Sequence, residues 1–380
     1  MDFGRTSREQ ELRGEVRAAL GEPEVRAALD ALRGEREPDV RPLYWALGRR
    51  GLLAVSWPEE YGGRGASHAE AAAVIEELVH GGVPDMLHVL SIQIVGLFLL
   101  QAGSPEQKAR LLPAMARGER FATVLYTEPE VGSDLAGLIT AATRDGKGYL
   151  LSGVKVYGLK SAMSDIGLCA ARTGRGPSKY DGISLFLVDL DAQGVRRSHI
   201  GSIADEQFDH VEFDRVRLGP ESVLGTEGEG WSLLTRCLAI ERTGLDYSLK
   251  AERWYRAALA GIEPDAADDR FLEQVGRYGA AVDAGRLMAW QIVDRLDHGE
   301  VDPAAAAAAK YHTSETAQEV ALWAAEVHGL GYTLRALADE QATVLEAAYR
   351  EAPGLTLSAG TSQIMLELVA STAFAAVEGN

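Results

Sequence analysis

Apolar residues recur at spacings of three and four positions through residues 1–121, which is the spacing of one face of an α-helix. The run from Ala71 to Leu78 is an example, with apolar side chains one helical turn apart. Gly81 and Pro84 follow this run, at a point where glycine and proline end a helix or form a turn. The pattern predicts an all-helical N-terminal domain.

The pattern changes over residues 122–228, where short runs rich in β-branched and aromatic residues are separated by Gly, Asp and Pro. The alternation of apolar and polar positions is clearest at Val211, Phe213 and Val216. Strands this short, with turns this frequent, predict a small antiparallel sheet or a β-barrel as the middle domain.

Helical spacing returns over residues 229–380, the expected C-terminal domain. Asp302 and Pro303 stand directly before a run of alanines. This arrangement supplies an N-cap side chain, a proline at the first helical position and strong helix formers after it. The whole chain is therefore expected to be α+β and mainly helical, in the order helix, sheet, helix.

The composition narrows the possible partners. The 380 residues include 56 acidic and 38 basic side chains, which gives a formal net charge of −18. Duplex nucleic acid and anionic membranes repel such a surface unless a basic patch overrides the net charge, and the sequence shows no such patch. No nucleic-acid partner is expected. The histidines form no HxxxH or His-Cys cluster, so no metal is expected either.

The most apolar run, from Met86 to Leu100, is too short to cross a membrane, because a spanning helix needs about 20 apolar residues. It also contains His88 and Gln93, so it is interpreted as a buried core helix and no membrane insertion is expected. The polar start of the chain lacks a secretory signal, and Cys169 and Cys237 lack CxxC spacing. A cytoplasmic location with reduced, buried cysteines is the simplest expectation.

The stretch from Tyr126 to Asp134, YTEPEVGSD, stands where helical spacing gives way to strand spacing. Thr127, Ser133 and the backbone amides around Gly132 form a turn rich in hydrogen-bond donors. Such a turn can bind the polar edge of a cofactor or a phosphate, although by itself it is more often a structural loop.

Seven motifs together resemble the acyl-CoA dehydrogenase family in order and spacing, and they extend over nearly the whole chain. The resemblance implies a helical N-terminal domain, a middle β-barrel and a C-terminal four-helix bundle, here divided at residues 1–121, 122–228 and 229–380. The motifs are PEEYGGRGAS, EELV, GSPEQKARLLPAMARGE, TEPEVGSD, SGVKVYG, HGLGY and AGTSQI.

The resemblance implies an FAD cofactor, an acyl thioester substrate and electron transfer to an electron-transfer flavoprotein. It also implies a homodimer or homotetramer, because Gly329 and Gly331 correspond to a segment that approaches the FAD pyrophosphate of a neighbouring subunit. Glycine suits that role because no Cβ keeps the backbone away from a phosphate. The resemblance places these residues at the cofactor: Tyr126, Thr127, Gly132, Ser133, Tyr157, Gly329, Gly331, Thr361 and Gln363. It places these at the substrate: Ser133, Arg242, Ala359 and Gly360.

The reaction that the resemblance implies needs a base for the α-proton while the β-hydrogen leaves as hydride to flavin N5. Many members carry this base, a glutamate, immediately before the GT of the late motif, but here that position is Ala359. A minority carry it in a Glu-Arg pair on the first helix of the C-terminal domain, which corresponds to Glu241 and Arg242.

Glu241 is a candidate base on the residue pattern as well. At about 100° per residue, this glutamate falls on the same arc as the apolar residues around it, so it should face inward and be partnered, protonated or turned towards a cofactor. The alternative is a structural glutamate bonded to an arginine. The apolar residues of the predicted arc are Trp231, Leu234, Leu238, Leu245 and Leu249.

Two features depart from the family pattern. Leu159 stands where members usually have a hydroxyl residue near flavin N5, and no adenine-binding Arg-to-Phe-Gly segment is recognisable. These departures, with Ala359, leave open a catalytically degenerate subunit that completes a hetero-oligomer. A specialised biosynthetic oxidase also remains an alternative. The acyl group, and the choice between coenzyme A and a carrier protein, stay open.

Overall fold

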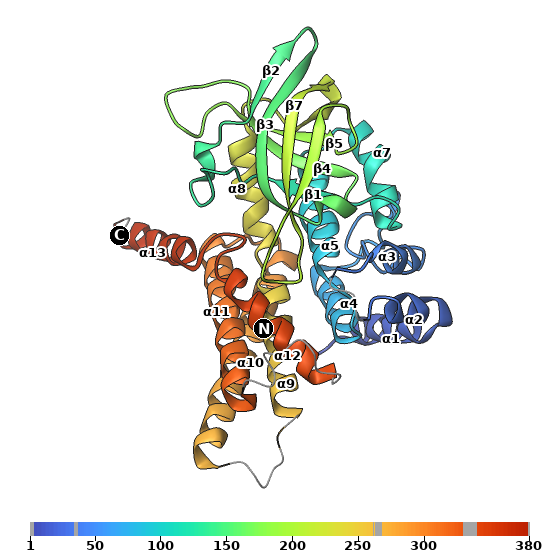
Figure 1. Ribbon diagram of the computed structural model, residues 1–380, viewed down its shortest axis with the longest axis vertical. Coiled ribbons are helices and arrows are strands. Elements are labelled where there is room, and N and C mark those ends of the chain that lie inside the picture. Colours follow the sequence, from blue (N-terminus) through green and yellow to red (C-terminus); the bar gives the residue numbers. More distant parts are fainter. Residues whose placement is uncertain (1–3, 34–36, 261, 263–267, 330–339, 379–380) are drawn as a thin grey trace. The chain divides into compact units, whose positions relative to one another are not determined.

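The computed structural model describes residues 4–33, 37–260, 262, 268–329 and 340–378 (Figure 1). The chain divides into two compact units. One, called here the N-terminal unit, comprises residues 5–202 and 206–241; the other, the C-terminal unit, comprises residues 203–205 and those from 242 onward, with Gly4.

The part of the N-terminal unit that precedes the sheet is helical, as the apolar spacing predicts. Ser67 and Ser104 begin two of these helices with reciprocal capping bonds to the residue three positions later. The helices are α1 (Ser7–Gly21), α2 (Pro23–Asp30), α3 (Arg41–Gly48), η1 (Glu59–Tyr61), α4 (His68–His80), α5 (Met86–His88), η2 (Val89–Gly96), α6 (Leu97–Ala102) and α7 (Pro105–Ala116).

The apolar run from Met86 is a buried helix, which confirms the prediction. Helices α5, η2 and α6 follow one another without a break, and η2 is a π-helical stretch. Val95, Phe98 and Leu99 are fully buried in the core that this helix shares with the first strand of the sheet. No helix among the described residues has the length and apolar character that a membrane crossing requires.

The middle region forms one eight-stranded sheet in the order β6-β7-β3-β2-β4-β5-β8, with β1 paired to β4 (Figure 1). The sheet is open, so the expectation of a β-barrel is wrong. The β1–β4 pair is parallel, whereas most neighbours are antiparallel. The strands are β1 (Ala122–Leu125), β2 (Ala141–Asp145), β3 (Gly148–Leu159), β4 (Ile166–Arg172), β5 (Ile183–Asp189), β6 (Val195–Ile200), β7 (Phe208–Leu218) and β8 (Val223–Leu224). Three short 3-10 helices join strands: η3 (Leu135–Gly137), η4 (Ser161–Met163) and η5 (Pro220–Ser222).

A β-bulge explains the uneven apolar spacing of β7. Phe213 pairs with Gly153 and Val216 with Leu151, so three steps along β7 oppose two along β3. Arg215 lies in the bulge with a φ of 52°, in the left-handed region. The extra residue keeps both Phe213 and Val216 facing the core, although they are three positions apart.

The C-terminal unit is helical, as predicted, and its helices surround α11, which packs against α9, α10, α12 and α13. Asp302 caps α11 by accepting a hydrogen bond from the amide of Ala305, and Pro303 is the first helical residue. Trp323 on α11 is buried among three aromatic rings, each pair contributing about 0.5–1.5 kcal/mol beyond burial alone. The helices are α9 (Leu245–Ala260), α10 (Asp269–Asp297), α11 (Pro303–His328), α12 (Glu340–Leu355) and α13 (Ser362–Glu378).

Helix α8 (Gly230–Glu241) belongs to the N-terminal unit. It contacts β5, α6 and η2. The sequence predicts one helix through residue 250, but the structure breaks it after Glu241. Gly244 turns the chain with a φ of 77°, a conformation that glycine adopts readily, before α9 begins.

Candidate functional site

The stretch from Tyr126 to Asp134 is a tight turn that leaves β1. The amide of Glu128 donates to the carbonyl of Val131 at 2.9 Å, and the amide of Val131 donates back at 3.0 Å. Gly132 and Ser133 follow this doubly bonded turn and are exposed. A Cβ at Gly132 would meet no heavy atom within 4 Å, so the backbone here is open to approach.

A buried ion pair holds this turn in place. The Lys155 ammonium on β3 lies 2.8 Å from the Glu128 carboxylate and donates to the Tyr126 carbonyl at 2.9 Å. Glu128 also accepts from the amides of Ile139 and Thr140, at 2.7 and 2.9 Å. The side chains of Glu128 and Lys155 are 2% and 0% exposed, so neither charge has water as an alternative partner.

Burial alone would raise the pKa of Glu128, but the charge and hydrogen bond of Lys155 outweigh it and hold that pKa below its ordinary value. This ion pair was not predicted from the sequence. The signal was present, because a lysine inside the β-rich run SGVKVYG needs a buried acidic partner if its position faces the core.

Tyr157 and Leu159 lie at the end of β3, where the strand becomes irregular. Tyr157 has a φ of 57° and is 60% exposed, and its ring meets the edge of Phe208 at a centroid distance of 6.1 Å. Leu159 packs against the apolar core of the N-terminal unit, and its carbonyl accepts from the Thr123 hydroxyl at 2.6 Å. The side chain that replaces the family's hydroxyl residue is thus used for packing.

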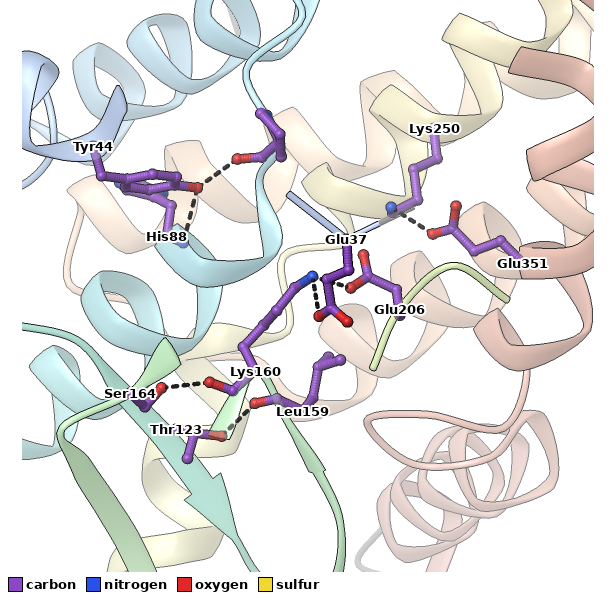
Figure 2. A network of polar contacts seen from close by, with 11 residues as sticks. Glu37, Tyr44, His88, Thr123, Leu159, Lys160, Ser164, Glu206, Lys250 and Glu351 are labelled. Atoms are coloured by element: carbon purple, nitrogen blue, oxygen red, sulfur yellow. Dashed lines mark hydrogen bonds and ion pairs between the residues drawn. The ribbon is translucent and has the colours of Figure 1, made fainter. Parts of the chain in front are cut away.

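Lys160 continues from this strand end into a second buried charge cluster, shown in Figure 2. Its ammonium lies 2.9 Å from Glu37 and 2.6 Å from Glu206. Burial alone would lower the pKa of Lys160, but the charges of Glu206 and Glu37 outweigh it and raise that pKa. Three segments far apart in sequence are therefore tied together next to Tyr157 and Leu159.

Glu241 is the last residue of α8 and is half-buried, with its Oε2 atom shielded from solvent. The buried face of α8 carries Leu233, Leu234 and Cys237, so Glu241 lies one turn beyond Cys237 on the same face. The predicted arc matches the buried face of α8 only in part, because Leu234 is buried whereas Trp231 and Leu238 are half-buried. The predicted continuation of the stripe through Leu245 and Leu249 does not hold, because these residues belong to α9.

In the C-terminal unit, two cations bind the carbonyls of the turn that precedes α13. Arg242 Nε donates to the Ala359 carbonyl at 3.2 Å, and the buried Lys310 ammonium donates to the carbonyls of Gly360 and Leu355, at 2.9 and 3.0 Å. Ala359 and Gly360 have φ angles of 53° and 94°. The turn is held by its backbone, while the Ala359 side chain is exposed.

The remaining predicted cofactor residues lie close to helix ends. Thr361 precedes α13, and its hydroxyl accepts from the amide of Ile364 at 3.3 Å. Gln363 lies in the first turn of α13 and is exposed. Gly329 ends α11 with a φ of 69° and open space around it. Gly331 lies outside the described residues.

The structure thus groups the predicted residues in two sets, one in each unit. Within the described residues, no group of three or more His, Cys, Asp or Glu side chains is arranged to hold a metal ion. The N-terminal unit carries Tyr126, Thr127, Gly132, Ser133, Tyr157 and Glu241, and the C-terminal unit carries Arg242, Gly329, Ala359, Gly360, Thr361 and Gln363.

Comparison with known proteins decides the family. Residues 6–119, 123–216 and 228–374 match the N-terminal, middle and C-terminal domain models of acyl-CoA dehydrogenase. The chain is 30% identical to acyl-CoA dehydrogenase FadE29 of Mycobacterium tuberculosis over 97% of this chain and 96% of that protein. The chain belongs to the acyl-CoA dehydrogenase family. Acyl-CoA dehydrogenase FadE26 of the same organism is also 30% identical, over the full length of both chains.

Two solved structures extend the likeness to three dimensions. A structure titled as a Tcur3481-Tcur3483 steroid ACAD has a TM-score of 0.87 and 27% identity, and it covers 99% of both chains. The ChsE4-ChsE5 complex from Mycobacterium tuberculosis has a TM-score of 0.81 and 27% identity, with the same coverage.

Members of the acyl-CoA dehydrogenase family bind FAD and act as flavin oxidoreductases on CH–CH donors, and this protein is such an enzyme. Acyl-CoA substrates and oligomeric assemblies are typical of the family. The donor set of the first turn fits the cofactor, because Gly132 leaves its backbone accessible and the neighbouring Ser133 is exposed.

Proposed function

We propose that this acyl-CoA dehydrogenase oxidises an acyl thioester with Glu241 as the base that takes the α-proton. The observation that carries the proposal is the position of Glu241. Its Oε2 atom is shielded from solvent at the end of α8, one helical turn after Cys237. Both residues lie near Tyr126, the first residue after β1. A carboxylate at this position, near the turn proposed to hold the ligand, suits a general base.

The turn that precedes α13 supports the same assignment, because it lacks a carboxylate. Ala359 offers no carboxylate at the position where many family members carry their base. Arg242, next to Glu241 in sequence, donates to the Ala359 carbonyl instead, and this bond fixes the backbone of the turn. Glu241 followed by Arg242 resembles the Glu-Arg pair in which a minority branch of the family carries its base.

We propose further that FAD is held by Tyr126, Thr127, Gly132, Ser133 and Tyr157, and by Gly329, Gly331, Thr361 and Gln363. FAD bound by these residues would supply the acceptor for the β-hydrogen, which leaves the substrate as a hydride. The chain's own contribution is a turn whose backbone is fixed by Glu128 and Lys155 before any ligand arrives. Preorganisation of this kind avoids the entropy cost of ordering a loop on binding.

Gly132→Val tests the cofactor assignment. A Cβ at Gly132 meets no heavy atom within 4 Å, so the substitution should leave the thermal midpoint of the protein without ligand unchanged while it lowers FAD occupancy. The measurement is the ratio of flavin to protein absorbance after purification. Gly174→Val is the matched control, because Gly174 also has open space around it and lies outside the proposed site. Full FAD occupancy in the Gly132 variant would refute the assignment.

The substrate is proposed to be an acyl-CoA or a carrier-protein-bound acyl group, with an electron-transfer flavoprotein as acceptor. Anaerobic bleaching of the flavin against a thioester panel tests the reaction directly. The panel should include straight-chain and steroid-derived acyl-CoA thioesters, since one similar structure is named a steroid ACAD. Bleaching by at least one thioester supports the proposal, and its absence with the whole panel contradicts it.

A non-catalytic subunit of a hetero-oligomer is the second candidate. Leu159 and Ala359 favour it, because each lacks a polar group that family members commonly use, and similar structures include a ChsE4-ChsE5 complex. The purified chain distinguishes the two. A homodimer or homotetramer near one FAD per chain favours the dehydrogenase, whereas a colourless chain that gains flavin only with a partner subunit favours the second candidate.

A further inference from the structure

The Tyr126 side chain buries a hydroxyl group whose role the packing around it does not explain. Its hydroxyl oxygen is buried, and it has no hydrogen-bond partner among the described residues. The ring packs against the apolar core formed by β1, α8 and the helices before the sheet. Burying a hydroxyl without replacing its hydrogen bonds to water lowers the stability of the fold, so a tyrosine at this position requires an explanation.

The position of Tyr126 is fixed from both sides. Leu125, the preceding residue, pairs with Cys169 in the β1–β4 register. The carbonyl of Tyr126 accepts from the Lys155 ammonium at 2.9 Å. These contacts fix the place at which the Tyr126 side chain leaves the backbone.

The groups near this hydroxyl come from α8 and β4. Burial is the main reason that the pKa of Tyr126 lies well above its ordinary value, and the nearby Cys237, Glu241 and Cys169 raise it further. The phenol therefore keeps its proton at neutral pH and can donate it in a hydrogen bond. Cys237 and Glu241 are four residues apart on α8, so the hydroxyl lies near the face of α8 that ends in Glu241.

We propose that the Tyr126 hydroxyl donates a hydrogen bond to an acceptor atom of the ligand bound beside Glu241. The inference deepens the proposed function and rests on it. The acceptor is an oxygen or nitrogen atom with a free lone pair. It belongs either to the acyl thioester or to the flavin ring. The hydroxyl is a ligand-binding group, separate from the base, and it contributes to specificity where the thioester supplies the acceptor.

Tyr126→Phe removes this oxygen and nothing else. In the purified holoenzyme without thioester, the thermal midpoint should stay the same or rise, because no internal hydrogen bond is lost. The dissociation constants of 2-enoyl-CoA thioesters of graded length, followed by the change in flavin absorbance, should increase by roughly 2- to 13-fold, the value of one net hydrogen bond. If the flavin supplies the acceptor, the FAD dissociation constant and the flavin spectrum change instead.

Tyr44→Phe is the matched control. Tyr44 is a buried tyrosine whose hydroxyl bonds to the Pro84 carbonyl and accepts from the His88 amide at 3.1 Å (Figure 2). This variant should lose thermal stability and keep its thioester and FAD affinities, the opposite of the pattern expected for Tyr126→Phe.

Two results would overturn the inference. One is a lower thermal midpoint in Tyr126→Phe with the FAD dissociation constant and the flavin spectrum unchanged, which would reveal a partner for the hydroxyl within the protein. The other is unchanged affinity for both the thioesters and FAD, together with an unchanged flavin spectrum. Failure of the proposed function is distinguishable, because it appears as a wild-type flavin that no thioester reduces, whereas the binding constants are measured with enoyl products and need no turnover.

Discussion

Glu241→Gln should slow flavin reduction by an acyl thioester by roughly 10²- to 10⁴-fold, the usual contribution of a general base. Glutamine keeps the size and hydrogen-bonding capacity of the side chain but has no basic carboxylate to take the α-proton. Thioester binding should persist, since the change is nearly isosteric. The measurement is anaerobic stopped-flow absorbance of the flavin, with the dissociation constant taken from the concentration dependence.

Glu252→Gln is the control for this prediction. Glu252 lies on α9, is partly buried and pairs with Arg256 one helical turn away. Its amide variant should reduce flavin at the wild-type rate. A Glu241→Gln enzyme that reduces flavin as fast as the wild type would show that another group takes the proton.

Lys155→Met should lower the free energy of unfolding by about 3–5 kcal/mol and deplete FAD. The substitution leaves the Glu128 carboxylate buried without its cation, and removing one partner of a buried pair costs this much. The Tyr126 carbonyl loses its donor at the same time, so the turn proposed to hold FAD loses a constraint. Chemical denaturation followed by circular dichroism measures the stability, and flavin absorbance measures the occupancy.

The double variant Lys155→Met/Glu128→Gln separates charge from packing. If the uncompensated charge causes the loss, the double variant should be more stable than Lys155→Met, because the glutamine side chain carries no charge and its one carbonyl oxygen can still accept from the backbone amide of Ile139 or of Thr140. Arg196→Met, which breaks an exposed pair with Glu212, should leave stability unchanged. Equal losses in Lys155→Met and the double variant would contradict the electrostatic explanation.

The same pair predicts a pH dependence. The folded-state pKa of Glu128 lies below its ordinary value of 4.5, so the stability it contributes is present above that value and is lost as the pH falls through the folded-state pKa. Lys155→Met should therefore be most destabilising near neutral pH, and its difference from the wild type should shrink in acid.

Local patterns were sufficient for the element types. Apolar spacing predicts the helices before residue 121 and after residue 229, and Asp302 with Pro303 marks the start of α11. These features depend on residues within one or two turns of each other, so the sequence contains the information directly.

The break after Glu241 and the open sheet needed longer-range information. The apolar arc from Trp231 to Leu249 continues across the break, but Gly244 takes a left-handed conformation against Ala309 and Thr313 of α11. A barrel closes only if its edge strands pair, and β6 and β8 remain at the two ends of the strand order. Alternation along a strand reports which face is buried and carries no information about edge pairing.

The candidate site divides in the same way. The sequence by itself determined the family resemblance, the turn from Tyr126 to Asp134 and the candidacy of Glu241, because each is a contiguous motif or a helical spacing. The tertiary structure alone decided that Lys155 neutralises Glu128, 27 residues away, and that the Tyr126 hydroxyl has no hydrogen-bond partner in the part of the chain that the structure describes. A charge or a hydroxyl acquires its partner from whichever segment folds against it, and that choice is made by packing between elements rather than by the residues beside it in the chain.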